Sequence, residues 1–378
     1  MLMSYLWKRM RRHAGEMLLT ALTVAVVVVL LLGLHYYYAA RQAELDEAYE
    51  KFEIRCTVTN ASGSRTTDLD IAAEYLDLFS EDGALSPYAK DVFLLRKIEN
   101  TAVSGTAVTL FMTNAPEASA YLEGAFIQYE EGRDSEAFHS SEPVCIVTDS
   151  LLRRVTDEGM LTVNTDWGEI SMRVIGSYMS EGEEAVFAAW EPMSALLVKN
   201  GVAAEAHSMA FTVADNRQLG QMKTVLHKYF VPASRTNKTA NMHGLVMDDS
   251  LFIDTVVVLE RGLALMRVVR VLVYVLSIGV SFLIAFLKIR TRKLELAVMR
   301  SMGARSITLY VEVLCEHILM FLLGAVAACG LAIPLGLLSG QNDLSVVGVF
   351  MLCYLVGVVL AVAQVTSGNI MQTLKGKE

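Results

Sequence analysis

The sequence predicts an α-helical membrane protein with four transmembrane helices and one large extracytoplasmic α+β domain. Hydrophobic residues make up 53% of the 378 residues, compared with about 45–50% in soluble globular domains. Most of this excess falls in four uninterrupted apolar runs, whereas the long stretch between the first two runs mixes strand-like and helix-like patterns. Basic residues gather in the short polar segments outside that stretch.

Four apolar runs define the spans. They contain 18, 17, 21 and 17 residues without a charged side chain, and a helix needs about 17–25 mainly apolar residues to cross the hydrocarbon. Buried core helices are the alternative for the second and fourth runs, but too little polar chain lies nearby to surround them. The runs are 17–34, 271–287, 318–338 and 346–362.

The first run is predicted to stay in the protein instead of being cleaved as a signal peptide. A signal peptide has an apolar core of about 7–15 residues and small residues at its cleavage site. Here the run is longer, and Tyr38 stands where a small residue is needed. Tyr36, Tyr37 and Tyr38 are instead typical of an aromatic belt at a membrane surface.

Charge predicts how the spans are oriented. Residues 1–16 carry four Lys/Arg and one acid, and residues 288–305 carry six Lys/Arg and one acid. Residues 39–261 carry 18 Lys/Arg against 35 Asp/Glu, a formal net charge of −17. Because short basic loops stay in the cytoplasm, both termini and the 288–305 loop are predicted to lie inside, and the long acidic domain outside.

These observations predict ten segments. They are a cytoplasmic amphipathic helix (1–16), the first span (17–38), the extracytoplasmic α+β domain (39–253), a stalk helix (254–270), the second span (271–289), a cytoplasmic loop helix (290–306), the third span with an interfacial start (307–338), a short outer loop (339–345), the fourth span (346–366) and a cytoplasmic tail (367–378).

The outer domain is predicted to alternate strands and helices. Residues 52–59 alternate with period two, residues 161–176 read as a hairpin, residues 66–79 have helical spacing, and residues 209–230 read as a strand followed by a helix capped by Asp215. No catalytic constellation stands out in it. The adjacent polar residues 139–142 are interpreted as a solvated loop, and the acidic balance as an ordinary soluble exterior.

The five cysteines permit one disulfide at most outside the membrane. Cys56 and Cys145 fall in the extracytoplasmic domain, where a disulfide can form. Whether they pair depends on a distance that the sequence leaves open. Cys315, Cys329 and Cys353 lie in or beside the third and fourth spans, where small apolar packing is expected. No Cys/His cluster has metal-ligand spacing, so we expect no metal site.

The loop between the second and third spans reads R-T-R-K-L-E-L-A-V-M-R-S-M-G-A-R-S over residues 290–306. It predicts a short amphipathic helix ending at Gly303, which suits the position that terminates a helix. Its charges exclude it from the hydrocarbon. The helix can therefore lie on the lipid surface or dock into a groove of a cytosolic partner. Its apolar arc contains Leu294, Ala297, Val298 and Met302, with Glu295 on its border and Arg300 outside it.

The stretch K-L-E-L-A-V-M-R-S-M-G-A-R resembles the loop motif of MacB/FtsX-type ABC transporter permeases, which is an acidic residue, small and aliphatic residues, then R-x-x-G-A. The resemblance extends to Glu316 and Gly324 at the start of the third span, and to E-G-R-D (131–134) with the strand and short helix after it. It implies a MacB-like periplasmic core domain. The exit of the fourth span departs from the family, because it lacks the Pro-Ala of many relatives.

The resemblance implies a function for this loop. It would dock onto the ATPase through Leu294, Glu295, Ala297, Val298, Met299, Arg300, Met302 and Gly303. The chain has no G-x-x-x-x-G-K-[ST] motif for nucleotide phosphates. We therefore expect ATP and Mg²⁺ on a separate ATPase subunit, no cofactor and no catalysis on this chain, a second permease copy or paralogue, and no nucleic-acid partner. Membrane lipid is a further expected partner, whereas the substrate, the choice between homodimer and heterodimer and the presence of an extracytoplasmic adaptor stay open.

The spans themselves favour transmission of movement over a hydrophilic pore. None of the four runs contains an ionisable residue, whereas transporters that pass polar substrates carry polar groups near the midplane. Small residues spaced by four in the third span predict a helix-packing seam. They are Gly324, Ala328, Ala332 and Gly336.

Two other functions are weighed. A cell-division-type permease that activates a cell-wall hydrolase would have a smaller outer domain. A membrane sensor would need a signalling output, and the residues after 362 are too few to form one. The preferred hypothesis is an ABC permease that exports or extrudes a peptide, lipid or drug-like substrate.

Overall fold

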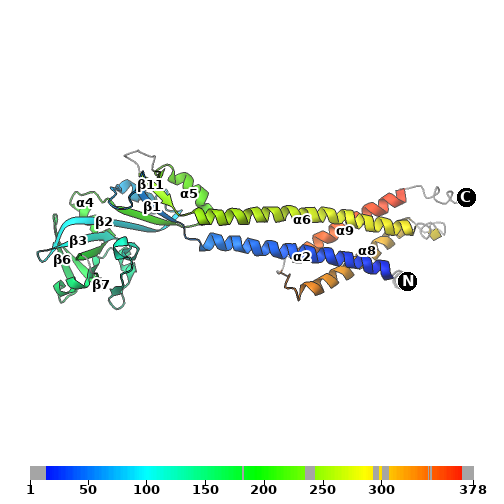
Figure 1. The fold of residues 1–378 in the computed structure, drawn as a ribbon, viewed down its shortest axis with the longest axis horizontal. Coiled ribbons are helices and arrows are strands. Elements are labelled where there is room, and N and C mark those ends of the chain that lie inside the picture. Colours follow the sequence, from blue (N-terminus) through cyan, green and yellow to red (C-terminus); the bar gives the residue numbers. More distant parts are fainter. Residues whose placement is uncertain are drawn as a thin grey trace. The chain divides into compact units, whose positions relative to one another are not determined.

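The protein is described by a computed structural model that covers residues 14–180, 183–234, 243–292, 298–299, 306–338, 340 and 343–367. The chain forms two compact units. Met1–Glu47 and Asp254–Glu378 make up the membrane unit, and Ala48–Ile253 make up the sheet unit. Figure 1 shows long helices in the first and strands in the second.

The membrane unit contains four long helices. Within the described residues, Met17–Lys51, Ser250–Thr291, Tyr310–Ala332 and Asp343–Gln364 are each long and apolar enough to cross a membrane. The chain is thus an α-helical membrane protein with an α+β domain, which confirms the predicted fold class. The helices are α2 (Ala14–Lys51), α6 (Ser250–Thr291), α8 (Ser306–Ala332) and α9 (Asp343–Ser367).

Two of these helices are much longer than a span. α2 has 38 residues and α6 has 42, so at 1.5 Å per residue they measure about 57 and about 63 Å. The hydrocarbon core is only about 30 Å thick. α6 contains the segments predicted as the stalk and the second span without a break between them. Each helix therefore continues well beyond its apolar run.

Gly336 does not continue the small-residue stripe, contrary to the sequence prediction. α8 ends at Ala332, and Pro334 follows, whose ring cannot extend a helix. Gly336 has φ +65° and its N–H donates to the carbonyl of Ile333 at 3.1 Å. It therefore forms a turn after the helix, in a conformation that favours glycine.

Glycines allow the helices of the membrane unit to approach closely. A Cβ at Gly324 of α8 would lie 2.6 Å from the carbonyl oxygen of Ala21 and 2.8 Å from the Cβ of Val24, both in α2. A Cβ at Gly357 of α9 would lie 2.5 Å from the carbonyl oxygen of Ile278 in α6. Only glycine permits both approaches, so α8 packs on α2 and α9 packs on α6.

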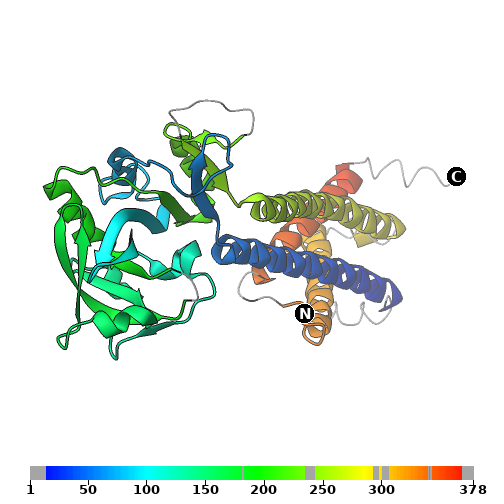
Figure 2. The ribbon, with the colours of Figure 1, turned by 60° about the vertical axis from the view of Figure 1, so that its left-hand side comes forward.

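The sheet unit is built on one mixed sheet, seen from two sides in Figures 1 and 2. In the described residues it has 11 strands in the order β10-β11-β1-β9-β2-β3-β8-β5-β7-β4, with β6 pairing both β2 and β7. That last pairing closes a ring of six strands. The strands are β1 (Arg55–Asn60), β2 (Ala89–Val103), β3 (Thr106–Thr113), β4 (Ile127–Tyr129), β5 (Val144–Thr148), β6 (Met160–Thr165), β7 (Gly168–Tyr178), β8 (Ala185–Ala189), β9 (Ser208–Val213), β10 (Val231–Pro232) and β11 (His243–Met247).

Three short α-helices accompany the strands, namely α3 (Ala73–Leu76), α4 (Trp190–Lys199) and α5 (Leu219–Leu226). The predicted hairpin is confirmed as β6 and β7, which pair from Met160↔Arg173 to Thr165↔Gly168. Asp215 caps the turn before α5 as predicted, because its side chain accepts from the N–H of Arg217. The helix expected over 66–79 is shorter, since Ile71 instead bridges to Ala206.

Alternation along the strands creates two apolar cores. Leu110 and Met112 of β3 point into one core, whereas Phe111 between them points into the other. Val147 and Ile146 of β5 divide in the same way. Both faces of these central strands are thus buried, and this explains why β5 and β8 read as continuous apolar runs.

Candidate functional site

The predicted ATPase-coupling residues lie mostly outside the described part of the chain. Leu294, Glu295, Ala297, Arg300, Met302 and Gly303 belong to that group. Val298 and Met299 are helical, and Val298 is 55% exposed. The role given to these eight residues stays a prediction.

A buried charged cluster lies beside this segment. It consists of Lys288 and Arg292, at the end of α6, and Glu316 of α8. Lys288 Nζ lies 2.8 Å from Glu316 Oε1, and the guanidinium of Arg292 donates to both carboxylate oxygens at 2.8 and 3.3 Å. The Lys288 and Glu316 side chains are each 7% exposed and that of Arg292 is 8% exposed. The cluster joins the two helices that flank the coupling segment.

Local geometry explains why these residues meet. Lys288 and Arg292 are four residues apart, so they project from one face of the end of α6. The N–H of Arg292 also donates to the carbonyl of Ile289 at 3.2 Å, which keeps its backbone next to the last turn. Cations are favourable at the C-terminal end of a helix, and the forked guanidinium matches a carboxylate with two hydrogen bonds.

The cluster was not predicted, because Lys288 and Arg292 count as loop charges when the sequence is read alone. A signal was present, since Lys288 and Arg292 have the i, i+4 spacing of one helical face. Glu316 was interpreted as interfacial and as a match to the family, without a partner. Which helix that face would meet depends on tertiary packing, and the spacing does not contain that information.

A buried hydrogen bond also connects α8 to α9. Nδ1 of His317 lies 2.8 Å from the hydroxyl of Tyr354. Tyr354 stacks at an angle against Phe321 and Phe350. Glu316 and His317 are neighbours in sequence, so α8 contacts α6 and α9 within a single turn.

Three of the four predicted seam residues lie in α8. Gly324 contacts α2, while Ala328 and Ala332 are completely buried in the core of the membrane unit. Gly336 lies beyond the helix end. A seam that uses the first three residues to join the helices stays a prediction.

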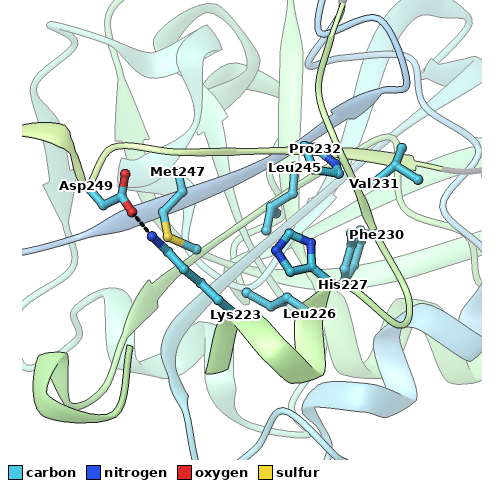
Figure 3. A pocket seen from close by; sticks show the side chains of 9 residues that line it. All are labelled: Lys223, Leu226, His227, Phe230, Val231, Pro232, Leu245, Met247 and Asp249. Atoms are coloured by element: carbon cyan, nitrogen blue, oxygen red, sulfur yellow. Dashed lines mark hydrogen bonds and ion pairs between the residues drawn. The ribbon is translucent and has the colours of Figure 1, made fainter. Parts of the chain in front are cut away.

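The sheet unit carries a pocket of about 240 Å³ between α5 and strands β10 and β11, shown in Figure 3. Lys223 and Asp249 form an ion pair at one side of it. The lining that the structure describes contains no Ser, Cys or Thr beside His227. The lining residues are Lys223, Leu226, His227, Phe230, Val231, Pro232, Leu245, Met247 and Asp249.

The adjacent polar residues 139–142 lie at the surface of the sheet unit. Arg133 donates to Glu142 at 3.2 Å across the predicted solvated loop, where His139 is exposed. Among the described residues, no group of three or more His, Cys, Asp or Glu is placed to hold a metal ion.

Cys56 and Cys145 are both free. They lie on β1 and β5, which are five strand positions apart in the sheet, whereas a disulfide needs Cα atoms within about 7 Å. Burial raises the pKa of each thiol to about 12. The question that the sequence left open is therefore answered, because these two cysteines do not pair.

No protein-family model matches this chain, and no curated protein matches it either. Among solved structures, it is similar to the periplasmic region of MacB from Actinobacillus actinomycetemcomitans, with 14% identity and a TM-score of 0.32 over 56% of this chain and 94% of that one. It is also similar to the extracellular domain of the noncanonic ABC-type transporter YknZ from Gram-positive bacteria, with 14% identity and a TM-score of 0.30 over 52% of this chain and 100% of that one.

Proposed function

We propose that this chain is the membrane-spanning subunit of an ABC transporter of MacB/FtsX type, driven by a separate ATPase subunit. One observation carries the proposal. The coupling-like stretch K-L-E-L-A-V-M-R-S-M-G-A-R connects α6 and α8, two helices able to span a membrane. A basic amphipathic segment at that place cannot enter lipid, so it is available to a cytosolic partner.

The length of α6 supports a mechanical role. The helix that ends beside the coupling segment begins at Ser250, three residues after β11. A continuous helix transmits a displacement along its hydrogen-bonded backbone without a hinge. Binding of ATP to the ATPase subunits would press on the coupling segment, and α6 would carry the movement out of the membrane. In energetic terms this is a population shift between two states, powered by nucleotide binding.

The polarity of the membrane unit supports action on a substrate outside the bundle. The charged cluster lies at the end of α6, and the apolar runs themselves contain no ionisable residue. Such a bundle offers no path for a hydrophilic solute. The proposed transporter therefore exports or extrudes a peptide, lipid or drug-like molecule from the outer leaflet or the extracytoplasmic space, as a dimer with both termini in the cytoplasm.

Co-purification tests the proposal. The tagged full-length chain is isolated from its host in mild detergent, and bound subunits that carry a G-x-x-x-x-G-K-[ST] motif and hydrolyse ATP are quantified. We expect Glu295→Lys and Met302→Asp to remove this subunit, because they place a reversed charge or a carboxylate on the docking face. Glu158→Lys and Met179→Asp introduce the same side chains at exposed positions of the sheet unit and serve as matched controls.

Two outcomes contradict the proposal. If the wild-type chain brings down no ATPase subunit, it is not part of such a transporter. If Glu295→Lys and Met302→Asp retain as much ATPase subunit as the two controls do, docking does not occur through this segment.

A further inference from the structure

We propose that Glu316 is a positioning residue for coupling, which holds the end of α6 to α8 so that both helices move together when the coupling segment is displaced. This inference rests on the proposed function. Glu316 lies outside the docking segment. It affects how the helices move when ATP binds, and it does not affect recognition of the ATPase.

The charged cluster joins the two helix ends between which the coupling segment runs in the sequence. That segment follows Arg292 and ends where α8 begins, at Ser306. Glu316 lies ten residues further on, which is about 15 Å along that helix. Its carboxylate reaches back to the last turn of α6 and to Arg292. A force on the segment thus meets a cross-link between its two flanking helices before it reaches the rest of the bundle.

The cross-link depends on long side chains. At this level the interval between the end of α6 and Glu316 of α8 is crossed by side-chain groups and not by backbone groups. Lys288 and Arg292 bridge that interval, and Lys288 Nζ also lies 3.4 Å from the sulfur of Met320. Ala285 and Ile289 add apolar packing to the cluster that contains Phe321 of α8, so the carboxylate supplies the polar part of the link between the end of α6 and α8.

Burial strengthens the cross-link. Within the described residues, the guanidinium of Arg292 donates to Glu316 alone, and its Nε has no partner. Separating buried opposite charges is costly, because neither lipid nor the apolar core replaces the lost partner. The end of α6 therefore follows α8 as long as the carboxylate is ionised.

The test uses the full-length chain with its ATPase subunit in lipid nanodiscs. A fluorophore at Val258→Cys, a position of α6 that is 69% exposed, reports ATP-dependent movement in a background without the native cysteines. Glu316→Gln keeps the side-chain shape and removes the charge. We expect this variant to retain the ATPase subunit. Its ATP-dependent change in fluorescence should be smaller than that of the wild type by between about 5-fold and 150-fold, the fold-change that typical coupling energies produce.

Two further variants separate positioning from folding. Lys288→Met/Glu316→Gln returns the formal charge of the cluster to its wild-type value without restoring the link between the helices. We expect this double variant to reach the wild-type amount in the membrane and still to lose the ATP-dependent change in fluorescence. Glu316→Asp, which keeps a carboxylate, is expected to recover part of it. Tyr354→Phe removes the buried hydrogen bond to His317 in the same turn of α8 and leaves the three charged side chains in place, so it is the matched control.

Each outcome decides something different. If Glu316→Gln binds the ATPase subunit and responds to ATP like the wild type, the inference is wrong and the proposed function stands. A double variant that recovers both accumulation and response shows a role in folding alone, which also overturns the inference. If the wild-type chain binds no ATPase subunit, the proposed function itself fails.

Discussion

The sheet unit and the membrane unit distribute charge in opposite ways. In the sheet unit, the ion pair of Arg133 with Glu142 has side chains that are 31% and 60% exposed. In the membrane unit, the ion pair of Lys288 with Glu316 is almost completely buried, while leucines and valines such as Leu272 and Val326 are exposed. Lipid replaces water around the second unit, so its apolar side chains face outward and its charges need partners inside.

This contrast shows where a single charge matters for each unit. A surface ion pair in water contributes little, because water solvates both partners almost as well. A buried pair contributes through the cost of breaking it, since the remaining charge stays desolvated. The membrane unit should therefore depend on Glu316 far more than the sheet unit depends on any of its surface carboxylates.

The largest expected effect tests that contrast directly. Glu316→Ala should lower the free energy of unfolding of the membrane unit by about 3–5 kcal/mol, because it leaves Lys288 and Arg292 without their carboxylate. Glu142→Ala should cost at most about 1 kcal/mol. The first change is measured by thermal unfolding in detergent of a chain in which Cys56 and Cys145 are replaced by alanine. A fluorogenic thiol reagent follows it, because its reaction with Cys315, Cys329 and Cys353 speeds up as the bundle opens. The fluorescence of Trp167 and Trp190, in a Trp7→Phe background, measures the second change. Equal losses would show that the cluster is solvated.

The next effect concerns close packing in α8. Gly324→Ala places a Cβ within 2.6 Å of the carbonyl oxygen of Ala21, so α2 must shift, at a cost of about 1–3 kcal/mol. Gly330 in the same helix has open space around its Cα. Gly330→Ala should therefore be neutral or stabilising by up to about 1 kcal/mol, because alanine favours the helix. The same thiol-based unfolding assay compares the two. A loss at Gly330 equal to that at Gly324 would reject the packing explanation.

Periodicity was enough to predict the elements whose neighbours are local. The four apolar runs became α2, α6, α8 and α9, and the alternation on either side of Asp166 became the β6–β7 hairpin. In these cases each residue's environment is set by the residues next to it in the chain. The cap at Asp215 was predictable for the same reason, since its hydrogen bond closes over two residues.

Contacts between distant residues were not predictable in this way. Arg292 and Glu316 are 24 positions apart, and the helical phase of each says only that both lie on a polar face. The shorter helix at α3 has a similar cause, because Ile71 is taken by a bridge to Ala206. The prediction that Gly336 belongs to the helical stripe was wrong for a local reason. The spacing of small residues continues past Pro334, but the helix does not, because proline cannot extend it.

The smallest effect is a pH dependence confined to the sheet unit. Burial lowers the pKa of His207 and of His243 below 6.5, their ordinary value. The unfolded chain therefore binds protons at these sites before the folded chain does, and the free energy of unfolding falls as the pH drops below about 6.5. Well above that pH the imidazoles are neutral in the unfolded chain as well, and the two histidines no longer make stability depend on pH.

The histidine variants isolate this contribution from that of the carboxylates. Denaturant unfolding at pH 7.5 and pH 5.5, followed by the fluorescence of Trp167 and Trp190, gives the loss of stability on acidification. His207→Gln/His243→Gln should show a smaller loss than the wild type, whatever its absolute stability. His139→Gln, at an exposed position, is the matched control and should leave the loss unchanged. A double variant with the wild-type loss would mean that the two imidazoles titrate alike in both states. The acid sensitivity of the sheet unit would then belong to its surface carboxylates. The sheet unit and the membrane unit would then differ in net charge and not in how deeply their titrating groups are buried.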